Sequence, residues 1–349
     1  MFVALIRLAV ITAALLLPSI AKAQSCGDTL YADTTLQSDI RCPVNSAFGL
    51  RIAAPNVTLD LNGFSIIVPT DPIPFVWGPA CVGSTTGVEV IRASGVSIRN
   101  GRIIDNGSCR RADGIHAIFS DATAVYDLEF DTPGGVGIEI IGSRDSSITQ
   151  NRFLAWIGVT LWASNAGRRL LTPDRTLIRD NIMPATNLPR FGLVMAYDSD
   201  DTTIANNLIE GAAMLVHAVS GSDRLQVFGN DLMQNPGPPT IYGVPAIFVQ
   251  SSLKARIQNN TIVSGAAGMV LEGDGHVVLG NHVEGMDTAI ELGRGTPASG
   301  IRLSENYLTT TNNGTGLWFW PAAISNDGSG NTFGSVTTPV RDQGAGNVY

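Results

Sequence analysis

Lysine and clusters of basic residues are nearly absent from this sequence of 349 residues. Its two lysines are Lys22 and Lys254, and no run of lysine and arginine alternates with aromatic residues. This argues against a nucleic-acid partner, because binding to phosphates needs a basic patch. None of the four cysteines belongs to a Cys-x-x-Cys pair, which argues against a zinc or thioredoxin-like motif.

Long apolar runs are also missing, apart from one at the N-terminus. Arg7 is followed by the apolar segment 8–17 and by an Ala-Lys-Ala cleavage site at 21–23, the pattern of a signal peptide. The run is too short to cross a bilayer, and no later segment approaches the roughly 20 apolar residues required. We therefore expect residues 1–23 to be removed, a secreted or periplasmic location, and no membrane span. The remaining chain, residues 24–349, carries a net charge of −10.

The cysteines lie in the N-terminal third of the chain, at Cys26, Cys42, Cys81 and Cys109. In an oxidising compartment they are expected to form two disulfides. Of the three possible pairings, Cys26–Cys42 with Cys81–Cys109 is the one favoured here. The bonds would pin the N-terminal cap and first coil, residues 24–66, which have no preceding coil to pack on.

An apolar-x-x-Asn-x-apolar unit recurs with 21 to 30 residues between successive asparagines, a spacing typical of solenoid repeats. Its members are Asn151, Asn181, Asn207, Asn230, Asn260, Asn281 and Asn306, with a degenerate copy at Asn331. A tight bend needs a left-handed backbone, which asparagine tolerates. Stacked coils would also place the amides about 4.8 Å apart. The repeat therefore predicts a hydrogen-bonded asparagine ladder.

A second unit consists of Gly or Ala and four residues of alternating polarity. Period two indicates strands, and no segment after the signal peptide has a convincing helical period. Strands this short bury a core only when coil stacks on coil. The predicted fold is therefore all-β: a single-stranded parallel β-helix of about ten to eleven coils, forming one domain over residues 24–349.

The first and third residues after each Gly or Ala are expected to point inward, and the second and fourth outward. The inward series is apolar throughout. It comprises Val88 and Val90, Ile115 and Ala117, Ile138 and Ile140, Val159 and Leu161, Leu193 and Met195, Met214 and Val216, Ile247 and Val249, Met269 and Leu271, Ile290 and Leu292, and Leu317 and Phe319.

The coils, the asparagine corner and the opening segment resemble secreted bacterial right-handed β-helix proteins of the pectate-lyase-like superfamily. That superfamily includes pectate lyases, polygalacturonases and uronate epimerases. The opening segment contains Cys26-Gly-Asp, Asp33-Thr-Thr-Leu, Asp39-Ile-Arg-Cys42-Pro and Val57-Thr-Leu-Asp-Leu-Asn-Gly63. The resemblance covers the chain from about Cys26 to Tyr349. It implies a right-handed helix and a substrate groove on the outer face of the first sheet.

The outward positions of three consecutive coils would align Glu89, His116 and Glu139 about 5 Å apart. Asp113 stands just before the strand of His116. A histidine between carboxylates can act as a general acid or base, and its neighbours would raise its pKa. These four residues are the predicted catalytic group. The alternative is an ordinary surface ladder of charged side chains.

Substrate contacts are predicted from two kinds of residue beside this group. Arg92, Arg111 and Arg144 lie in flanking loops and could pair with a uronate carboxylate, as lyases and epimerases require before they remove the proton at C5. Trp162 and Tyr197 could stack on sugar rings. Polysaccharide is therefore the expected partner.

A second outward file is apolar: Val194, Leu215, Phe248 and Val270. An apolar file of this size is not expected to stay bare. Either the Pro- and Gly-rich loop 234–244 covers it, or a second chain does, which would make the protein oligomeric.

Motifs of the superfamily's characterised enzymes are absent, including the polygalacturonase set and the Asp-Pro-His-Asp of alginate epimerases. We expect no cofactor: calcium lacks a supporting motif, and the scattered His217, His276 and His282 do not suggest a metal site. The predicted function is that of a carbohydrate-active protein, and the predicted reaction is that of a lyase, an epimerase or a glycoside hydrolase. The alternative is a non-catalytic binding, adhesive or surface-structural protein. A metalloenzyme accessory protein would need clustered histidines.

Overall fold

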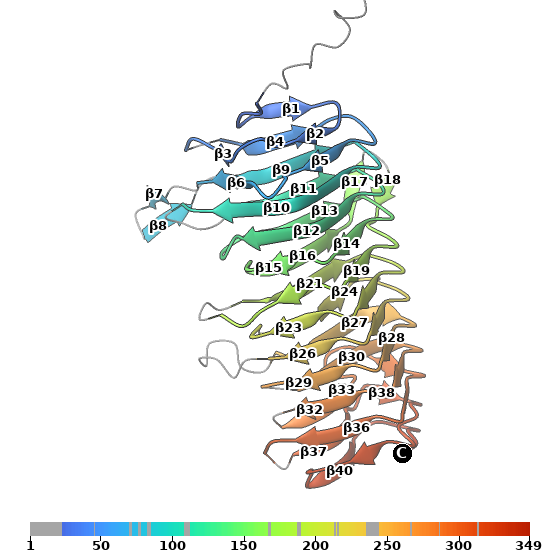
Figure 1. Ribbon diagram of the computed structural model, residues 1–349. Coiled ribbons are helices and arrows are strands. Elements are labelled where there is room, and N and C mark those ends of the chain that lie inside the picture. The colour runs from blue at the N-terminus through green and yellow to red at the C-terminus, as the bar shows by residue number, and fades with distance from the viewer. Residues whose placement is uncertain are drawn as a thin grey trace, which may run out of the picture.

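The computed structural model describes residues 23–349 except 45, 70–71, 76–77, 82–84, 108–111, 167–168, 187–189, 213, 215, 235–243, 266, 286 and 313. Every element in these ranges is a β-strand, and the strands wind into an elongated stack of turns (Figure 1). The predicted signal peptide, Cys109, Arg111 and Leu215 lie outside the described residues. No described helix could cross a membrane.

The first sheet stacks strands of successive turns in chain order, all parallel. These strands are β1 (Asp28–Leu30), β4 (Phe48–Ile52), β9 (Thr86–Ile91), β11 (Asp113–Ile118), β13 (Val136–Ile141), β16 (Ile157–Trp162), β21 (Gly192–Tyr197), β24 (Val216–Val219), β27 (Ile247–Leu253), β30 (Met269–Asp274), β33 (Thr288–Leu292), β37 (Thr315–Phe319) and β40 (Thr338–Asp342). At its side, β34 (Ala298–Ser299) pairs with β30 and with β38 (Ala323–Ile324).

In most turns the chain bends after the first-sheet strand and enters a strand of a second sheet. It contains β2 (Thr34–Thr35), β5 (Thr58–Asp60), β10 (Ser97–Asp105), β12 (Ala124–Asp131), β14 (Ser147–Thr149), β19 (Leu177–Arg179), β22 (Thr203–Ala205), β25 (Gln226–Phe228), β28 (Arg256–Gln258), β31 (Val277–Leu279) and β35 (Arg302–Ser304).

A third sheet completes each turn, and the long strands β10 and β12 belong to both the second and the third. Its other strands are β3 (Ile40–Arg41), β6 (Ser65–Val68), β15 (Arg152–Phe153), β20 (Ile182–Met183), β23 (Leu208–Glu210), β26 (Asp231–Met233), β29 (Thr261–Val263), β32 (His282–Gly285), β36 (Tyr307–Thr310) and β39 (Thr332–Phe333).

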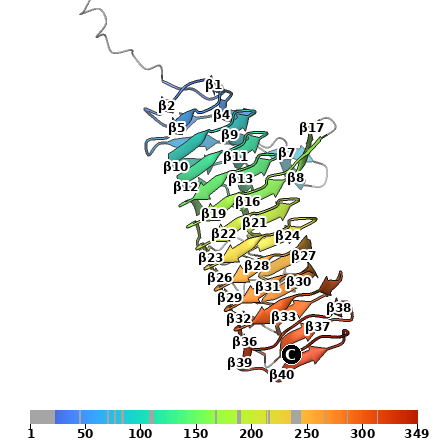
Figure 2. The ribbon, with the colours of Figure 1, turned by 90° about the vertical axis from the view of Figure 1, so that its right-hand side faces the viewer.

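Two antiparallel hairpins interrupt the turns. The pair β7 (Pro72–Phe75) and β8 (Gly78–Cys81) precedes β9, and the pair β17 (Ser164–Ala166) and β18 (Arg169–Leu171) follows β16. They lie on opposite sides of the stack in Figure 1 and project from the same side in Figure 2. The hairpins therefore arise at opposite ends of two first-sheet strands, β9 and β16, which are separated by β11 and β13.

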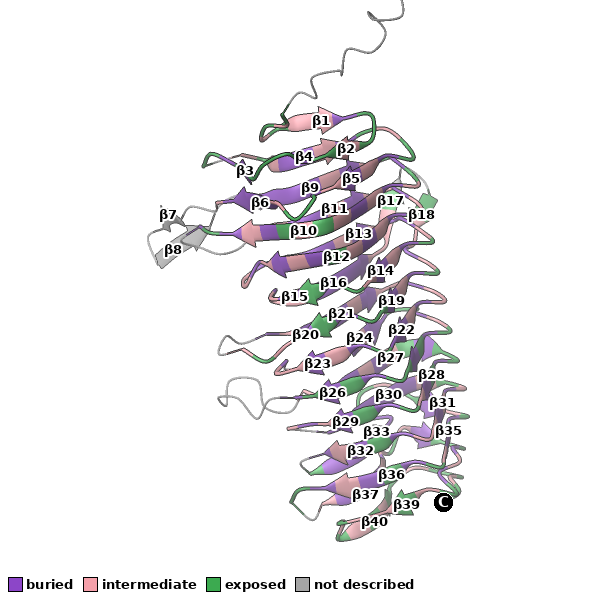
Figure 3. Ribbon diagram, in the orientation of Figure 1, coloured by how far each residue is buried: buried purple, intermediate pink, exposed green. Residues whose placement is uncertain are grey.

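The core is the apolar interior between the sheets, shown as buried segments along every turn in Figure 3. Phe130 and Phe153 stack inside it with their ring centroids 5.1 Å apart. A Cβ on Gly137 would lie 2.6 Å from Phe153 and 2.7 Å from the Gly158 carbonyl. Glycine therefore leads this strand because the next turn leaves no room for a side chain.

The inward series is confirmed in most turns, but the predicted register is wrong by one residue in β21. There Val194 pairs with Val159 and with Val216, so Val194 and Ala196 point inward and Met195 points outward. In β24 the predicted faces are right: Val216 points inward and His217 outward, and Ala218 is the second inward residue of the strand. The segment 193–196 is apolar at every position, so alternation could not specify the face, and a one-residue slip exchanges all faces.

The asparagine ladder is confirmed. Each amide nitrogen donates to the amide oxygen of the asparagine one turn later, at 2.8–3.1 Å, from Asn151 through Asn331. The predicted backbone reason is wrong, however. Positive φ belongs to the preceding residue, for example Gln150 (60°), Asp180 (56°) and Asn206 (52°). Asparagine is therefore needed for its amide, which satisfies buried backbone groups at the corner.

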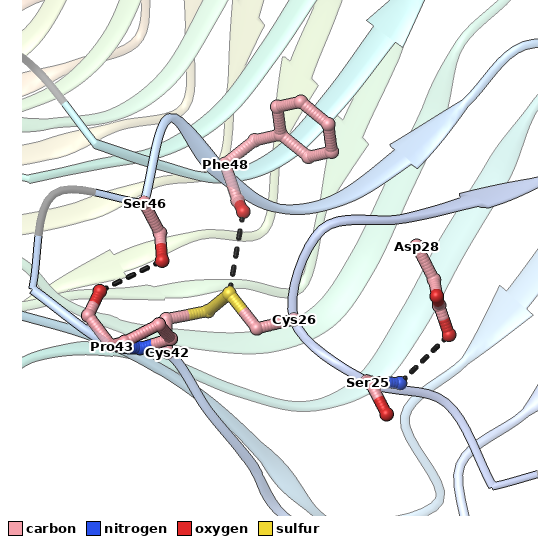
Figure 4. The surroundings of a disulfide bond; sticks show 7 residues. All are labelled: Ser25, Cys26, Asp28, Cys42, Pro43, Ser46 and Phe48. Carbon is pink, nitrogen blue, oxygen red and sulfur yellow. Dashed lines mark hydrogen bonds between the residues drawn. A yellow bond between two sulfur atoms is a disulfide. The ribbon is translucent and has the colours of Figure 1, made fainter.

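The predicted Cys26–Cys42 disulfide is present (Figure 4). It joins the segment before β1 to the segment after β3 and so closes the first turn. The Cys81–Cys109 pairing involves residues whose side chains lie outside the description.

Replacing both Cys26 and Cys42 by alanine is expected to lower the free energy of unfolding by about 3 kcal/mol, because the bond closes a loop of 16 residues. Chemical denaturation of the non-reduced protein measures the loss. The control is Ser46→Ala in the same segment, whose hydroxyl bonds only to the Pro43 carbonyl. A double variant as stable as the control would contradict the pinning role.

Candidate functional site

A file of polar side chains runs along the outer face of the first sheet at its N-terminal end. The parallel register aligns Arg51 of β4, Glu89 of β9, His116 of β11, Glu139 of β13 and Thr160 of β16. The alternation of each strand places the apolar neighbours of these residues in the core. The predicted alignment of Glu89, His116 and Glu139 is therefore the observed one.

His116 lies at the centre of this file and has acidic neighbours on two sides. Its Nε2 is 3.2 Å from an oxygen of Asp113 and 3.2 Å from an oxygen of Glu139. Its Nδ1 is 3.1 Å from the Thr86 hydroxyl. The other Asp113 oxygen accepts the Val136 amide at 2.7 Å, which holds this carboxylate in place. The imidazole is thus fixed through both nitrogens.

Burial and charge act in opposite directions on His116. Burial lowers the pKa of the imidazole, but the Asp113 hydrogen bond and the charges of Glu139, Asp113 and Glu89 outweigh it, so the pKa lies above its usual 6.5. Burial is the main cause of the raised pKa of Glu139, which the charge of His116 partly offsets. The histidine side chain is 14% exposed, which still leaves it within reach of solvent.

This pKa shift predicts how stability varies with pH. A raised folded-state pKa means that the contribution of His116 is complete below pH 6.5 and is lost as the pH rises through the folded value. The difference in unfolding free energy between wild type and His116→Gln should therefore be largest in mildly acid solution and shrink toward alkaline pH. Denaturant titrations across this range measure it, with the exposed His282→Gln as control. A difference that grows with pH would contradict the assignment.

Sequence reasoning missed two members of the site. Arg51 donates from Nε and Nη2 to one oxygen of Glu89, at 2.9 and 2.7 Å. Thr86 shares the strand of Glu89 and meets His116. The signal for Arg51 was available, because Gly49-Leu-Arg-Ile repeats the glycine-led unit of the later strands.

The arginines predicted to contact substrate are not gathered around His116 among the described residues. Arg144 pairs with Asp121 at 3.6 Å in the turn beyond the first sheet, so its ion pair is not with the His116 group. Arg92 occupies the turn after β9 with a φ of 51°. Arg111 lies outside the described residues, directly before the strand of Asp113.

The two predicted aromatic residues form a stack with each other. Trp162 and Tyr197 are paired across neighbouring strands, with centroids 4.1 Å apart and planes inclined by 4°. One face of each ring is therefore occupied, and a sugar could contact only the edges or the remaining faces. The aromatic row continues with His217, which meets Tyr197 edge to face at 6.0 Å and stacks on Phe248 at 5.3 Å.

The predicted apolar file needs correction at Val194, which points into the core and is 1% exposed. Met195 and His217 occupy the outward places instead, followed by Phe248 and Val270 as predicted. Val244 and Pro245, at the end of the loop expected to cover the file, line a hollow together with Phe248 and Val270. Contact with a second chain stays a prediction.

One family model matches part of the chain. It is described as a periplasmic copper-binding protein, NosD, and it aligns with residues 82–241, less than half of the sequence. No curated protein sequence matches.

The described residues do not fit a copper site. No three histidine, cysteine, aspartate or glutamate side chains among them form a group suited to a metal ion. His276 uses its Nδ1 for the Ala255 amide and its Nε2 for the Glu272 carbonyl. His116 is engaged at both nitrogens, His217 packs between Tyr197 and Phe248, and His282 meets the Tyr307 ring edge to face.

Solved structures of similar shape are parallel β-helix proteins. The mannuronan C-5 epimerase AlgE6 A-module of Azotobacter vinelandii is 16% identical, with 97% of this chain and 93% of that chain covered and a TM-score of 0.54. The Streptococcus pneumoniae surface protein and adhesin PfbA is 10% identical, with 93% and 90% covered and a TM-score of 0.57. The Dettilon tailspike protein is 12% identical, with 93% and 62% covered and a TM-score of 0.52. At these identities the likeness shows the fold alone: the chain is a right-handed parallel β-helix.

Proposed function

We propose that this protein is a carbohydrate-active enzyme that acts on a polysaccharide lying along the outer face of the first sheet. His116 would be its general acid or base. The observation that carries the proposal is the position of His116 Nε2. This atom is 3.2 Å from an oxygen of Asp113 on its own strand and 3.2 Å from an oxygen of Glu139 on the next turn. Structural likeness to an epimerase module supports the scaffold for such chemistry but not the residues.

The arrangement supplies a proton donor and a proton acceptor close together. In the imidazolium form, Nδ1–H is directed at the Thr86 hydroxyl and Nε2–H at Asp113 and Glu139. The raised pKa keeps that proton on His116 nearer to neutral pH. Glu139, whose pKa is also raised, accepts a proton more readily than an exposed glutamate. One group can therefore remove a proton from a sugar while the other delivers one.

Lyase or epimerase chemistry is the specific form we favour. Removal of the C5 proton of a uronate requires neutralisation of its carboxylate as well as a base. Arg51 is the guanidinium that the described file contains, and it is held in place by Glu89. Arg111, two residues before Asp113, is the second candidate for this role. A glycoside hydrolase would instead use the same proton at the glycosidic oxygen.

Three features support a location outside the cytoplasm. The expected signal peptide at residues 1–23, the Cys26–Cys42 disulfide and the periplasmic description of the partly matching family support a secreted or periplasmic location.

A turnover screen of the mature protein tests the proposal. Alginate, polygalacturonate, glycosaminoglycans and neutral glycans are incubated with it. Unsaturated product, reducing ends and epimer ratios are recorded for each. Turnover of any one supports the enzyme, and the product type assigns lyase, epimerase or hydrolase. If none of these polysaccharides is turned over, the enzyme proposal is contradicted.

A non-catalytic glycan-binding role is the second candidate, and a specific observation favours it. The polar atoms of the His116 group are satisfied by each other, as in a structural ladder of charged side chains. Glycan binding without turnover in the same screen would establish this role.

A further inference from the structure

The hollow beside Phe248 and Val270 lies on the same face as His116 but far from it. It has a volume of about 380 Å³ and is formed over β27 and β30. Six strand-to-strand steps separate Val270 from His116 along the outward file, roughly 29 Å at the usual strand spacing. The volume falls in the lower part of the range for small-molecule sites. It suits one or two sugar rings rather than a wide polymer groove.

The hollow has an apolar end and a polar end. Met214, Val244 and Pro245 form the apolar end, and the floor is the half-buried ring of Phe248 beside Val270. The polar end consists of Gln250, Glu272, Arg294 and Gly295. A pyranose has the matching character, with an apolar C–H face and a rim of hydroxyl groups.

The lining is held in place before any ligand arrives. The ring of Phe248 stacks on His217 at 5.3 Å with the planes 17° apart. Glu272 is 1% exposed and accepts the Gly295 amide and the Thr296 hydroxyl, the latter at 2.8 Å. Such preorganisation reduces the entropy that binding costs.

The charge of the hollow selects among sugars. Arg294 is the cation in its lining, and it already faces Glu291 at 3.7 Å. Glu272 adds a further carboxylate, so acidic groups outnumber the single guanidinium. Glu291 also accepts the Trp320 indole N–H at 3.0 Å. A uronate carboxylate would be repelled here, whereas neutral hydroxyl groups can donate to Gln250 and accept from Arg294.

We propose that this hollow is a non-catalytic binding site for a neutral pyranose unit, stacked on Phe248 and hydrogen-bonded at Gln250 and Arg294. The site does not depend on the chemistry at His116. A protein without turnover would still bind neutral sugar here.

The test is calorimetric titration of the mature chain with hexaoses of glucose, mannose and galactose, and with hexamers of mannuronate and galacturonate. Phe248→Ala should weaken binding of the neutral ligand about tenfold, because it removes the stacking ring. Gln250→Ala should weaken it severalfold without touching the core. Phe228→Ala, an exposed phenylalanine on the second sheet, is the matched control and should bind as wild type.

His116→Ala separates this site from the proposed active site, because it should leave the neutral-sugar affinity unchanged. Thermal unfolding of each variant identifies any loss of folding. If Phe248→Ala does not fold, the affinity of Gln250→Ala for the neutral hexaose decides whether the hollow binds the sugar. The proposal is overturned if no neutral hexaose binds, if Phe248→Ala weakens binding of the uronate hexamers as much as binding of the neutral hexaose, or if Phe248→Ala and Gln250→Ala both bind as the control does.

Discussion

His116→Ala is expected to lower kcat by about 10²–10⁴-fold on whichever polysaccharide the turnover screen identifies, because it removes the proposed general acid or base. The imidazole is the group that both Asp113 and Glu139 contact through Nε2, so no neighbour can replace it without moving. Glu139→Gln should also reduce kcat, because it removes the carboxylate that exchanges protons with the imidazole. Steady-state kinetics at several pH values measures both losses.

Two controls distinguish catalysis from structure. His282→Ala alters an exposed histidine on the third sheet and should leave kcat unchanged. His116→Gln keeps a polar side chain of similar length, so it should reach the native fold, with the lower stability in acid predicted above, while remaining inactive. Full turnover by folded His116→Ala would show that the site lies elsewhere on the helix.

Asn230→Ala is expected to lower the free energy of unfolding by about 3 kcal/mol, because it leaves buried polar groups without partners. Asn230 donates to Asn260 at 2.9 Å and to the Ile204 carbonyl at 3.0 Å. Its oxygen accepts from both the backbone and the side-chain nitrogen of Asn207, each at 2.9 Å. The substitution therefore interrupts the ladder in the middle of the stack.

Chemical denaturation of Asn230→Ala measures this loss. Asn312→Ala is the matched control: Asn312 is exposed and bonds to Asp287 at 3.0 Å, so its removal should cost far less. Equal stabilities for the two variants would show that the ladder follows from the fold without contributing to it.

The outward face of the first sheet shows where sequence reasoning succeeded. Glu89, His116 and Glu139 stand between apolar inward residues, so strand alternation alone predicted that they share a face. Parallel stacking of equivalent units then predicted that they are neighbours, which the register confirms. Whether they catalyse a reaction stays a prediction.

The same reasoning was wrong at β21, and the physical reason is that this segment has no polar position. Leu193, Val194, Met195 and Ala196 are apolar, so no residue identified the outer face. Pairing with Val159 decided it, and that pairing belongs to the tertiary structure.

The β-helix, its asparagine ladder and the Cys26–Cys42 bond could be predicted from the chain alone, because repeats, alternation and nearby cysteines are local patterns. Which side chains complete each site depends instead on how the turns pack on one another. Arg51 reaches Glu89 across 38 residues, and Arg294 reaches the hollow above Phe248 across a similar distance in sequence. Such contacts depend on the length and path of each turn, and those are set when one coil settles on the next.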